Sequence, residues 1–153
     1  MMALRTHIGD AAVLDALAAR LERAAPDCAR VWGTMDVQQM LVHVGDAAAS
    51  ALGRRPFSTT TRSGPRGLVR LIALYLVPRT PRGIKSGAEP ADKVLDRETF
   101  ARDRERAIEL LRDMAAPGQG FAAEHPAFGA MNRGDWLRYA YLHTDHHLRQ
   151  FGL

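Results

Sequence analysis

Apolar residues recur every three or four positions in four stretches of the 153-residue chain, and residues that cap or break helices bound each stretch. The first predicted helix begins at the cap residue Asp10 and ends before Pro26. The second begins at the cap residue Asp36 and ends at Gly53, a residue type suited to the position just past a helix. Both helices have an apolar face that must pack against other parts of the chain.

The third and fourth stretches lie in the C-terminal half. The third predicted helix begins at Asp92 or Asp96 and ends at Ala116, with a strongly charged outer face. The fourth is capped by Asn132 and continues to about Phe151. Four amphipathic helices without a convincing strand pattern predict an all-α protein whose helices pack around one core.

The connection between the second and third predicted helices, residues 54–92, is long and rich in Pro, Gly and Arg. Within it, only Leu68–Val77 has the pattern of a short helix, which Pro78 would end. A connection of this length is typical of a crossover that leads the chain from one end of a helix bundle to the other. We therefore predict a four-helix bundle with a long crossover between helices 2 and 3, in a single domain over residues 1–153.

Three histidines indicate the chemistry of this protein. His143 and His147 are four residues apart in the last predicted helix, so their side chains lie on one face, one turn apart. His43 lies beside the apolar stripe of the second predicted helix. Three imidazoles can bind one metal ion at nitrogen–metal distances of about 2.0–2.1 Å, although buried histidines can also simply hydrogen-bond. We predict a metal site formed by His43, His143 and His147, and we place His146 outside it.

Helix geometry sets a condition on this site. His43 lies roughly 10 Å along its helix, and His143 and His147 lie roughly 17 and 22 Å along a helix of roughly 28 Å. The three residues meet at one level only if the two helices are antiparallel. Helices that simply alternate in direction would make them parallel, whereas a crossover over residues 54–92 makes them antiparallel. The metal site and the long connection therefore support each other.

The net charge of +4 is unevenly distributed, because residues 47–88 contain eight basic and no acidic residues. A basic stretch over residues 54–85 can bind the carboxylates of a small cosubstrate, or it can be a solvated connection. Few aromatic residues lie between these arginines, so we do not expect a nucleic-acid partner. The longest apolar run, residues 71–77, is far shorter than the roughly 20 residues of a membrane span, so we expect no membrane partner.

Cysteine usage bears on the location of the protein. Cys28 is the only cysteine, so the chain cannot form an internal disulfide, and we expect a reducing cytoplasm. The first apolar residues are interrupted by Arg5, His7 and Asp10, so no signal peptide is visible. We predict that Cys28 is an inert, packed residue and not a catalytic thiol.

Several motifs follow one another along nearly the whole chain: Trp32-Gly-Thr-Met, Gln39-Met-Leu-Val-His43, His125-Pro-Ala-Phe-Gly129, Trp136, and His143 followed by His146-His-Leu-Arg-Gln-Phe-Gly152. Together they resemble the DinB-like (damage-inducible) superfamily, and more closely a branch whose members carry a domain of unknown function. The resemblance implies a four-helix bundle with a crossover after helix 2, often as a homodimer. It also implies a divalent metal, zinc or nickel, held by His43, His143 and His147.

Three functions stay open at this point. A metal-dependent thiol S-transferase would acidify a low-molecular-weight thiol at the ion, and a metal-dependent hydrolase would acidify water. The chain has Thr144 where zinc proteases of the HExxH type carry a glutamate, so a hydrolase would need another base, for which Asp46 is the candidate. The third function is a non-catalytic, stress-associated binding dimer. We favour thiol transfer over hydrolysis and assign no catalytic residue beyond the ligands.

Overall fold

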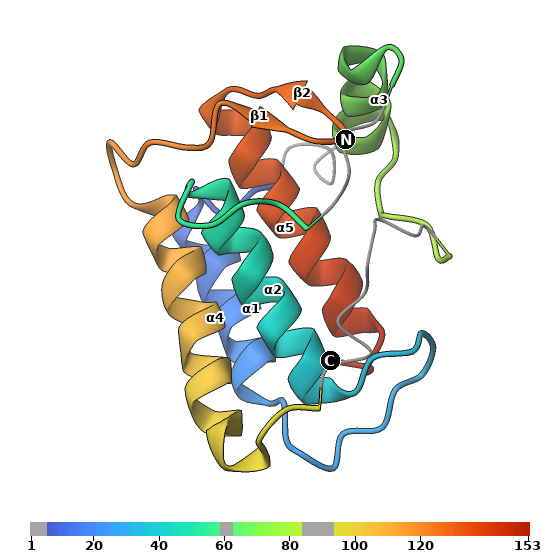
Figure 1. Ribbon diagram of the computed structural model, residues 1–153, viewed down its shortest axis with the longest axis vertical. Coiled ribbons are helices and arrows are strands. Elements are labelled where there is room, and N and C mark those ends of the chain that lie inside the picture. Colours follow the sequence, from blue (N-terminus) through green and yellow to red (C-terminus); the bar gives the residue numbers. More distant parts are fainter. Residues whose placement is uncertain (1–5, 59–62, 84–93) are drawn as a thin grey trace.

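The computed structural model describes residues 6–58, 63–83 and 94–153, and in these ranges the chain is mainly α-helical, as predicted (Figure 1). Its elements are, in order, α1 (Ala11–Glu22), α2 (Val37–Ala51), α3 (Arg66–Leu71), the π-helical turn η2 (Ile72–Leu76), the 3-10 turn η4 (Arg97–Thr99), α4 (Phe100–Ala115), β1 (Glu124–His125), β2 (Gly129–Ala130) and α5 (Arg133–Arg149). The two short strands pair antiparallel, in a segment where the sequence predicts a loop.

Local hydrogen bonds fix the starts of the two helices that carry the three histidines. At α2, the Asp36 carboxylate accepts from the backbone N–H of Gln39, and the Gln39 side chain accepts from the backbone N–H of Asp36, both at 2.8 Å. At α5, Asn132 and Asp135 form the same reciprocal pair at 2.9 and 3.1 Å. These capping boxes satisfy backbone donors that the first helical turn leaves unpaired, so both predicted starts are confirmed.

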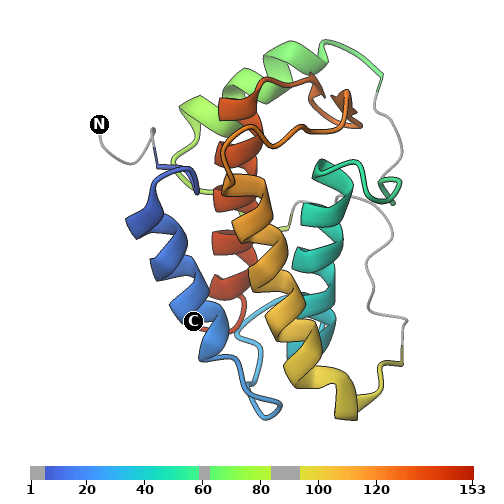
Figure 2. The ribbon, with the colours of Figure 1, turned by 90° about the vertical axis from the view of Figure 1, so that its left-hand side faces the viewer.

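Helices α1, α2, α4 and α5 lie alongside one another (Figures 1 and 2). Both views show α2 and α4 running in one direction and α1 and α5 in the other. The backbone N–H of Val31 donates to the carbonyl of Gln150 at 2.6 Å, which ties the segment before α2 to the end of α5. The N–H of Ala122 donates to the carbonyl of Ala51 at 2.8 Å and ties the end of α2 to the segment before α5. Helices α2 and α5 are therefore antiparallel, as the predicted site requires.

The hydrophobic core lies between these helices. All four contribute to its most completely buried apolar side chains, with Leu17, Leu21, Met40, Leu41, Val44, Leu111, Met114, Trp136 and Leu148. Burying one side chain of this size stabilises the folded state by about 1.5–3 kcal/mol. Packing of apolar faces, more than the helix propensity of any one segment, therefore holds the two histidine-bearing helices in register.

The connection from α2 to α4 leads the chain from one end of these helices to the other (Figure 1). Its described part contains α3 and η2, which together cover nearly the same residues as the predicted helix Leu68–Val77. The hydroxyl of Tyr75 donates to Asp135 at 2.5 Å, and the guanidinium of Arg138 donates to the carbonyl of Leu74 at 2.9 Å. These bonds hold η2 against the first half of α5.

Part of the connection lies outside the described residues. This applies to Asp92, one of the two predicted starts of the third helix, and to Arg62 and Lys85 of the basic stretch. The other predicted start, Asp96, caps the turn η4 that leads directly into α4. No helix in the described ranges is long and apolar enough to cross a membrane.

Candidate metal centre

Helices α2 and α5 bring His43, His143 and His147 together, and we refer to these residues as the three-histidine cluster. The Nε2 atoms of His43 and His143 are 3.1 Å apart. One ring nitrogen from each of the three residues lies within 4.8 Å of the other two. Register along two antiparallel helices therefore produces the convergence that the sequence predicts.

The geometry of the cluster fits a shared cation. Two nitrogens at about 2.05 Å from an ion in tetrahedral geometry are roughly 3.3 Å apart, close to the separation of the His43 and His143 Nε2 atoms. The His147 ring meets the other two at 77° and 71°, and the ring centroids are 4.6 Å apart in both pairs. The rings thus surround a common point and do not stack on one another, so these three residues can hold a metal ion.

Protonation also suits metal binding. Burial lowers the pKa of His143 well below its usual value of 6.5, and the neighbouring His147 and His43 lower it further. Burial, followed by the charge of His43, lowers the pKa of His147 to about 3. Both rings are therefore neutral at pH 7, and neutral imidazole is the form that coordinates metals.

Two further side chains contact the rings of the three-histidine cluster. The Nδ1 atom of His147 lies 2.7 Å from Oε1 of Gln150, and the ring of Tyr139 stacks on His143 with a centroid distance of 5.3 Å. The ring of His125, which belongs to β1, packs edge-on against Tyr139 at 4.9 Å. Neither Gln150 nor Tyr139 is predicted from the sequence as a partner of these rings. Their spacing, three residues after His147 and four before His143, is a helical signal from which both contacts follow.

Asp46, the predicted base of a hydrolase, is engaged elsewhere. One carboxylate oxygen forms an ion pair with Arg106 of α4 at 3.2 Å, and the other pairs with Arg55. With both oxygens held by arginines, the carboxylate is poorly placed to take a proton from water. We therefore assign Asp46 a structural role, in which it links α2 to α4 and to the residues that follow α2.

His146 and Cys28 stay outside the cluster. The Nδ1 atom of His146 lies 3.3 Å from the carbonyl oxygen of Thr80, and its ring packs edge-on against Trp32. The side chain of His146 is thus buried toward the connection and the segment before α2. The half-buried Cys28 accepts a hydrogen bond from the N–H of Ala25 at 3.4 Å, which agrees with a packed residue.

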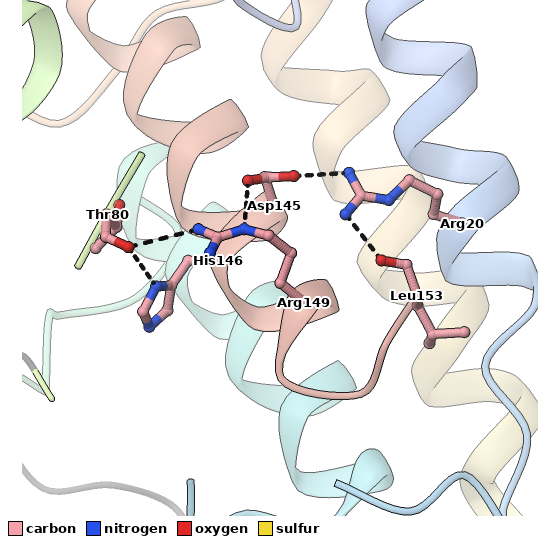
Figure 3. A network of polar contacts seen from close by, with 6 residues as sticks. All are labelled: Arg20, Thr80, Asp145, His146, Arg149 and Leu153. Carbon is pink, nitrogen blue, oxygen red and sulfur yellow. Dashed lines mark hydrogen bonds and ion pairs between the residues drawn. The ribbon is translucent and has the colours of Figure 1, made fainter. Parts of the chain in front are cut away.

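A polar network holds the C-terminal half of α5 in place (Figure 3). One oxygen of the buried Asp145 accepts from Arg20 of α1, and the other accepts from Arg149, both at 2.9 Å. Arg20 also donates to the carbonyl of Leu153 at 2.9 Å, and Arg149 reaches the carbonyl of Thr80 at 3.5 Å. The turn of α5 that carries His143 and His147 is therefore anchored to α1 and to the connection.

Part of the chain matches a known protein family. Residues 70–152 match the family described as "Protein of unknown function (DUF1569)", a region that includes His143 and His147 but not His43. A search of curated proteins and a search of solved structures each found no match. Because residues 70–152 make up more than half of the 153 residues, this chain belongs to the DUF1569 family, whose function is unknown.

Proposed function

We propose that this protein is a DinB-like four-helix bundle that binds zinc or nickel through His43, His143 and His147. The observation that carries the proposal is the convergence of three imidazoles from antiparallel helices, of which His143 and His147 are kept neutral by burial. Imidazole is a ligand of both metals. Three protein ligands leave at least one coordination position open, which is typical of catalytic sites and not of structural ones.

The reaction that we propose is thiol S-transfer, in the cytoplasm and by a homodimer. A divalent ion lowers the pKa of a thiol that coordinates it. The thiol sulfur attacks an electrophilic carbon of the second substrate, a C–S bond forms, and the leaving group departs with its electron pair. The thiol proton passes to solvent. Arginines of the basic stretch would bind the carboxylates of the thiol substrate.

Hydrolysis is the second candidate, and the surroundings of Asp46 make it less favoured. A hydrolase needs a group that takes a proton from the attacking water. Both Asp46 oxygens are already paired with arginines. Thiol transfer depends less on such a base, because a thiol is more acidic than water and a metal held by the three histidines would lower its pKa further.

A non-catalytic, stress-associated binding dimer is the third candidate. The 3.1 Å separation of the His43 and His143 Nε2 atoms also fits a hydrogen bond between two neutral imidazoles. A metal-free cluster of hydrogen-bonded histidines would then stabilise the core and have no reaction to catalyse. Metal content decides between this candidate and the first two.

The test of metal binding is elemental analysis of protein purified without added metal. We expect about one divalent ion per chain, a much lower content in His43→Ala, and unchanged content in His146→Gln. His146 is the matched control, because it is buried next to His147 but lies outside the cluster. Equal metal content in all three proteins, or none in the unaltered protein, contradicts the proposed metal site.

The test of the reaction uses the metal-loaded protein with a low-molecular-weight thiol and an electrophilic haloalkane. We expect conjugate to form faster than in a parallel sample of His143→Ala, with release of one halide per C–S bond. Conjugation at the rate of the His143→Ala sample contradicts thiol transfer. Hydrolysis of ester substrates by the same preparation would instead support the second candidate.

A further inference from the structure

The side chain of Gln150 lies between the three-histidine cluster and the segment before α2. Gln150 is the C-terminal cap residue directly after α5, and its side chain is buried. Its Oε1 atom is 2.7 Å from Nδ1 of His147. Its main-chain carbonyl accepts from the N–H of Val31 at 2.6 Å, so the backbone at this position is also held. The amide is therefore in a fixed position beside one of the three candidate ligands.

Gly33 leaves the space that this amide occupies. A Cβ atom on Gly33 would lie 2.9 Å from Nε2 of Gln150 and 3.4 Å from its Cδ, closer than side chains normally pack. The φ angle of Gly33 is +94°, a conformation that side-chain-bearing residues rarely adopt. The Trp-Gly-Thr-Met motif before α2 and the Gln-Phe-Gly motif after α5 thus meet at this contact.

The contact has a chemical consequence for His147. A neutral imidazole carries one N–H, and a carbonyl oxygen can only accept a hydrogen bond. The amide oxygen facing Nδ1 therefore favours the tautomer with the proton on Nδ1, which leaves the lone pair on Nε2. That lone pair is what a metal ion in the cluster requires, and the hydrogen bond also fixes the rotation of the ring.

We propose that Gln150 is the positioning residue of the metal site: it sets the proton of His147 on Nδ1, orients the ring, and occupies space that Gly33 provides. This inference rests on the proposed metal binding and adds a role for two residues that do not themselves coordinate. Groups that hydrogen-bond to a metal-binding histidine increase metal affinity, and removing one typically weakens metal binding by roughly 10–100-fold.

The first test is made on the unaltered, metal-free protein and needs no substitution. Long-range ¹H–¹⁵N correlation spectra distinguish the two neutral tautomers of each histidine. We expect the proton of His147 on Nδ1. A proton on Nε2 overturns the inference, because Gln150 would then not set the tautomer.

The second test compares zinc affinities, measured by competition with a chelator, and unfolding of the metal-free proteins in urea. We expect Gln150→Leu to bind zinc roughly 10–100-fold more weakly than the unaltered protein. We expect Gln150→Glu to bind within about threefold of it or more tightly, since a carboxylate oxygen accepts the same bond. Gln38→Leu is the matched control, because Gln38 is also buried but its side chain donates to the carbonyl of Asp96 and not to a histidine of the cluster.

The results separate positioning from general stability. Weaker zinc binding in Gln150→Leu with normal binding in Gln38→Leu supports the inference, whatever the two substitutions do to unfolding. Unchanged binding in Gln150→Leu, or an equal loss in Gln38→Leu, overturns it while the proposed metal site stands. If the unaltered protein binds no zinc, nickel or cobalt, the proposed function fails and the inference fails with it. The tautomer of His147 in the unaltered protein remains decisive if Gln150→Leu does not fold.

Discussion

Replacement of Asp145 by Asn should lower the free energy of unfolding more than the loss of a surface ion pair would. The substitution keeps the shape of the side chain but removes its charge. In the folded protein, the two carboxylate oxygens of Asp145 accept from Arg20 and Arg149 (Figure 3). An Asn amide has one acceptor and one donor group, so one of the two arginines would face an N–H instead of an oxygen.

The expected magnitude follows from the exposure of the three side chains. Breaking a fully buried ion pair costs about 3–5 kcal/mol, because the remaining charge is left without a partner. The Asp145 side chain is 11% exposed, whereas Arg20 and Arg149 are each 25% exposed and can recover some hydration. We therefore expect a loss of about 2–3 kcal/mol, below the fully buried case.

The assay is unfolding in urea, followed by circular dichroism. For a protein of this size, a loss of 2–3 kcal/mol lowers the midpoint by roughly 1–2 M urea. The matched control is Asp113→Asn, which breaks the ion pair of Asp113 with Arg54, in which both side chains are nearly half exposed. That pair should contribute less than about 1 kcal/mol. Equal midpoints for the two variants would show that burial of the Asp145 network does not strengthen it.

Three further predictions concern α5 and the three-histidine cluster. Tyr75→Phe removes the hydroxyl that donates to the buried Asp135 and should lower the free energy of unfolding by about 1–3 kcal/mol in urea titration; an unchanged midpoint contradicts this. Asn132→Ala removes the cap of α5 and should cost about 1 kcal/mol, with Asn132→Asp as the conservative control. Zinc at 1,000 times its dissociation constant should raise the free energy of unfolding by about 4 kcal/mol in the unaltered protein but not in His43→Ala, and a chelator should reverse the gain.

The features that the sequence predicts correctly depend on neighbours in the chain. The capping boxes at Asp36 and Asn132 join residues three apart, and the apolar stripes follow helical periodicity. The convergence of His43 with His143 and His147 is a contact between distant residues, yet it also follows from local quantities. Helix lengths and the length of one connection determine which positions along the two helices lie next to each other. Occupancy by a metal and the reaction stay predictions, because neither depends on geometry alone.

The features that cannot be predicted from the sequence are contacts between distant segments that no repeating pattern of residues indicates. Asp46 has the spacing of a group beside His43, but its partner Arg106 lies on another helix, and nothing local indicates that pairing. The hairpin of β1 and β2 contains only two residues in each strand, too few for an alternating pattern. The role of Gln150 depends on space left by Gly33, which becomes visible only when the segment before α2 is placed next to the end of α5.

His125 makes the stability of the metal-free protein depend on pH in a predictable direction. Burial lowers its pKa from the usual 6.5 to about 4. Its Nδ1 accepts from the N–H of Ala127 at 3.1 Å, which a protonated ring could not do. Between pH 6.5 and 4 the unfolded chain therefore binds a proton that the folded chain does not. Stability must fall as the pH is lowered through this window and be independent of His125 above it.

The size of the effect and its assignment to His125 can both be measured. A pKa lowered from 6.5 to about 4 corresponds to a loss of about 3 kcal/mol once the pH reaches 4, and to roughly 2 kcal/mol at pH 5. His143 and His147 change stability in the same direction, so the test compares urea unfolding at pH 7.5 and 5.0 for the unaltered protein and for His125→Phe. Phenylalanine suits the site, because the rings of Phe128 and Tyr139 pack against this position. The variant should lose roughly 2 kcal/mol less between the two pH values, and equal losses would mean that His125 is not held neutral by burial.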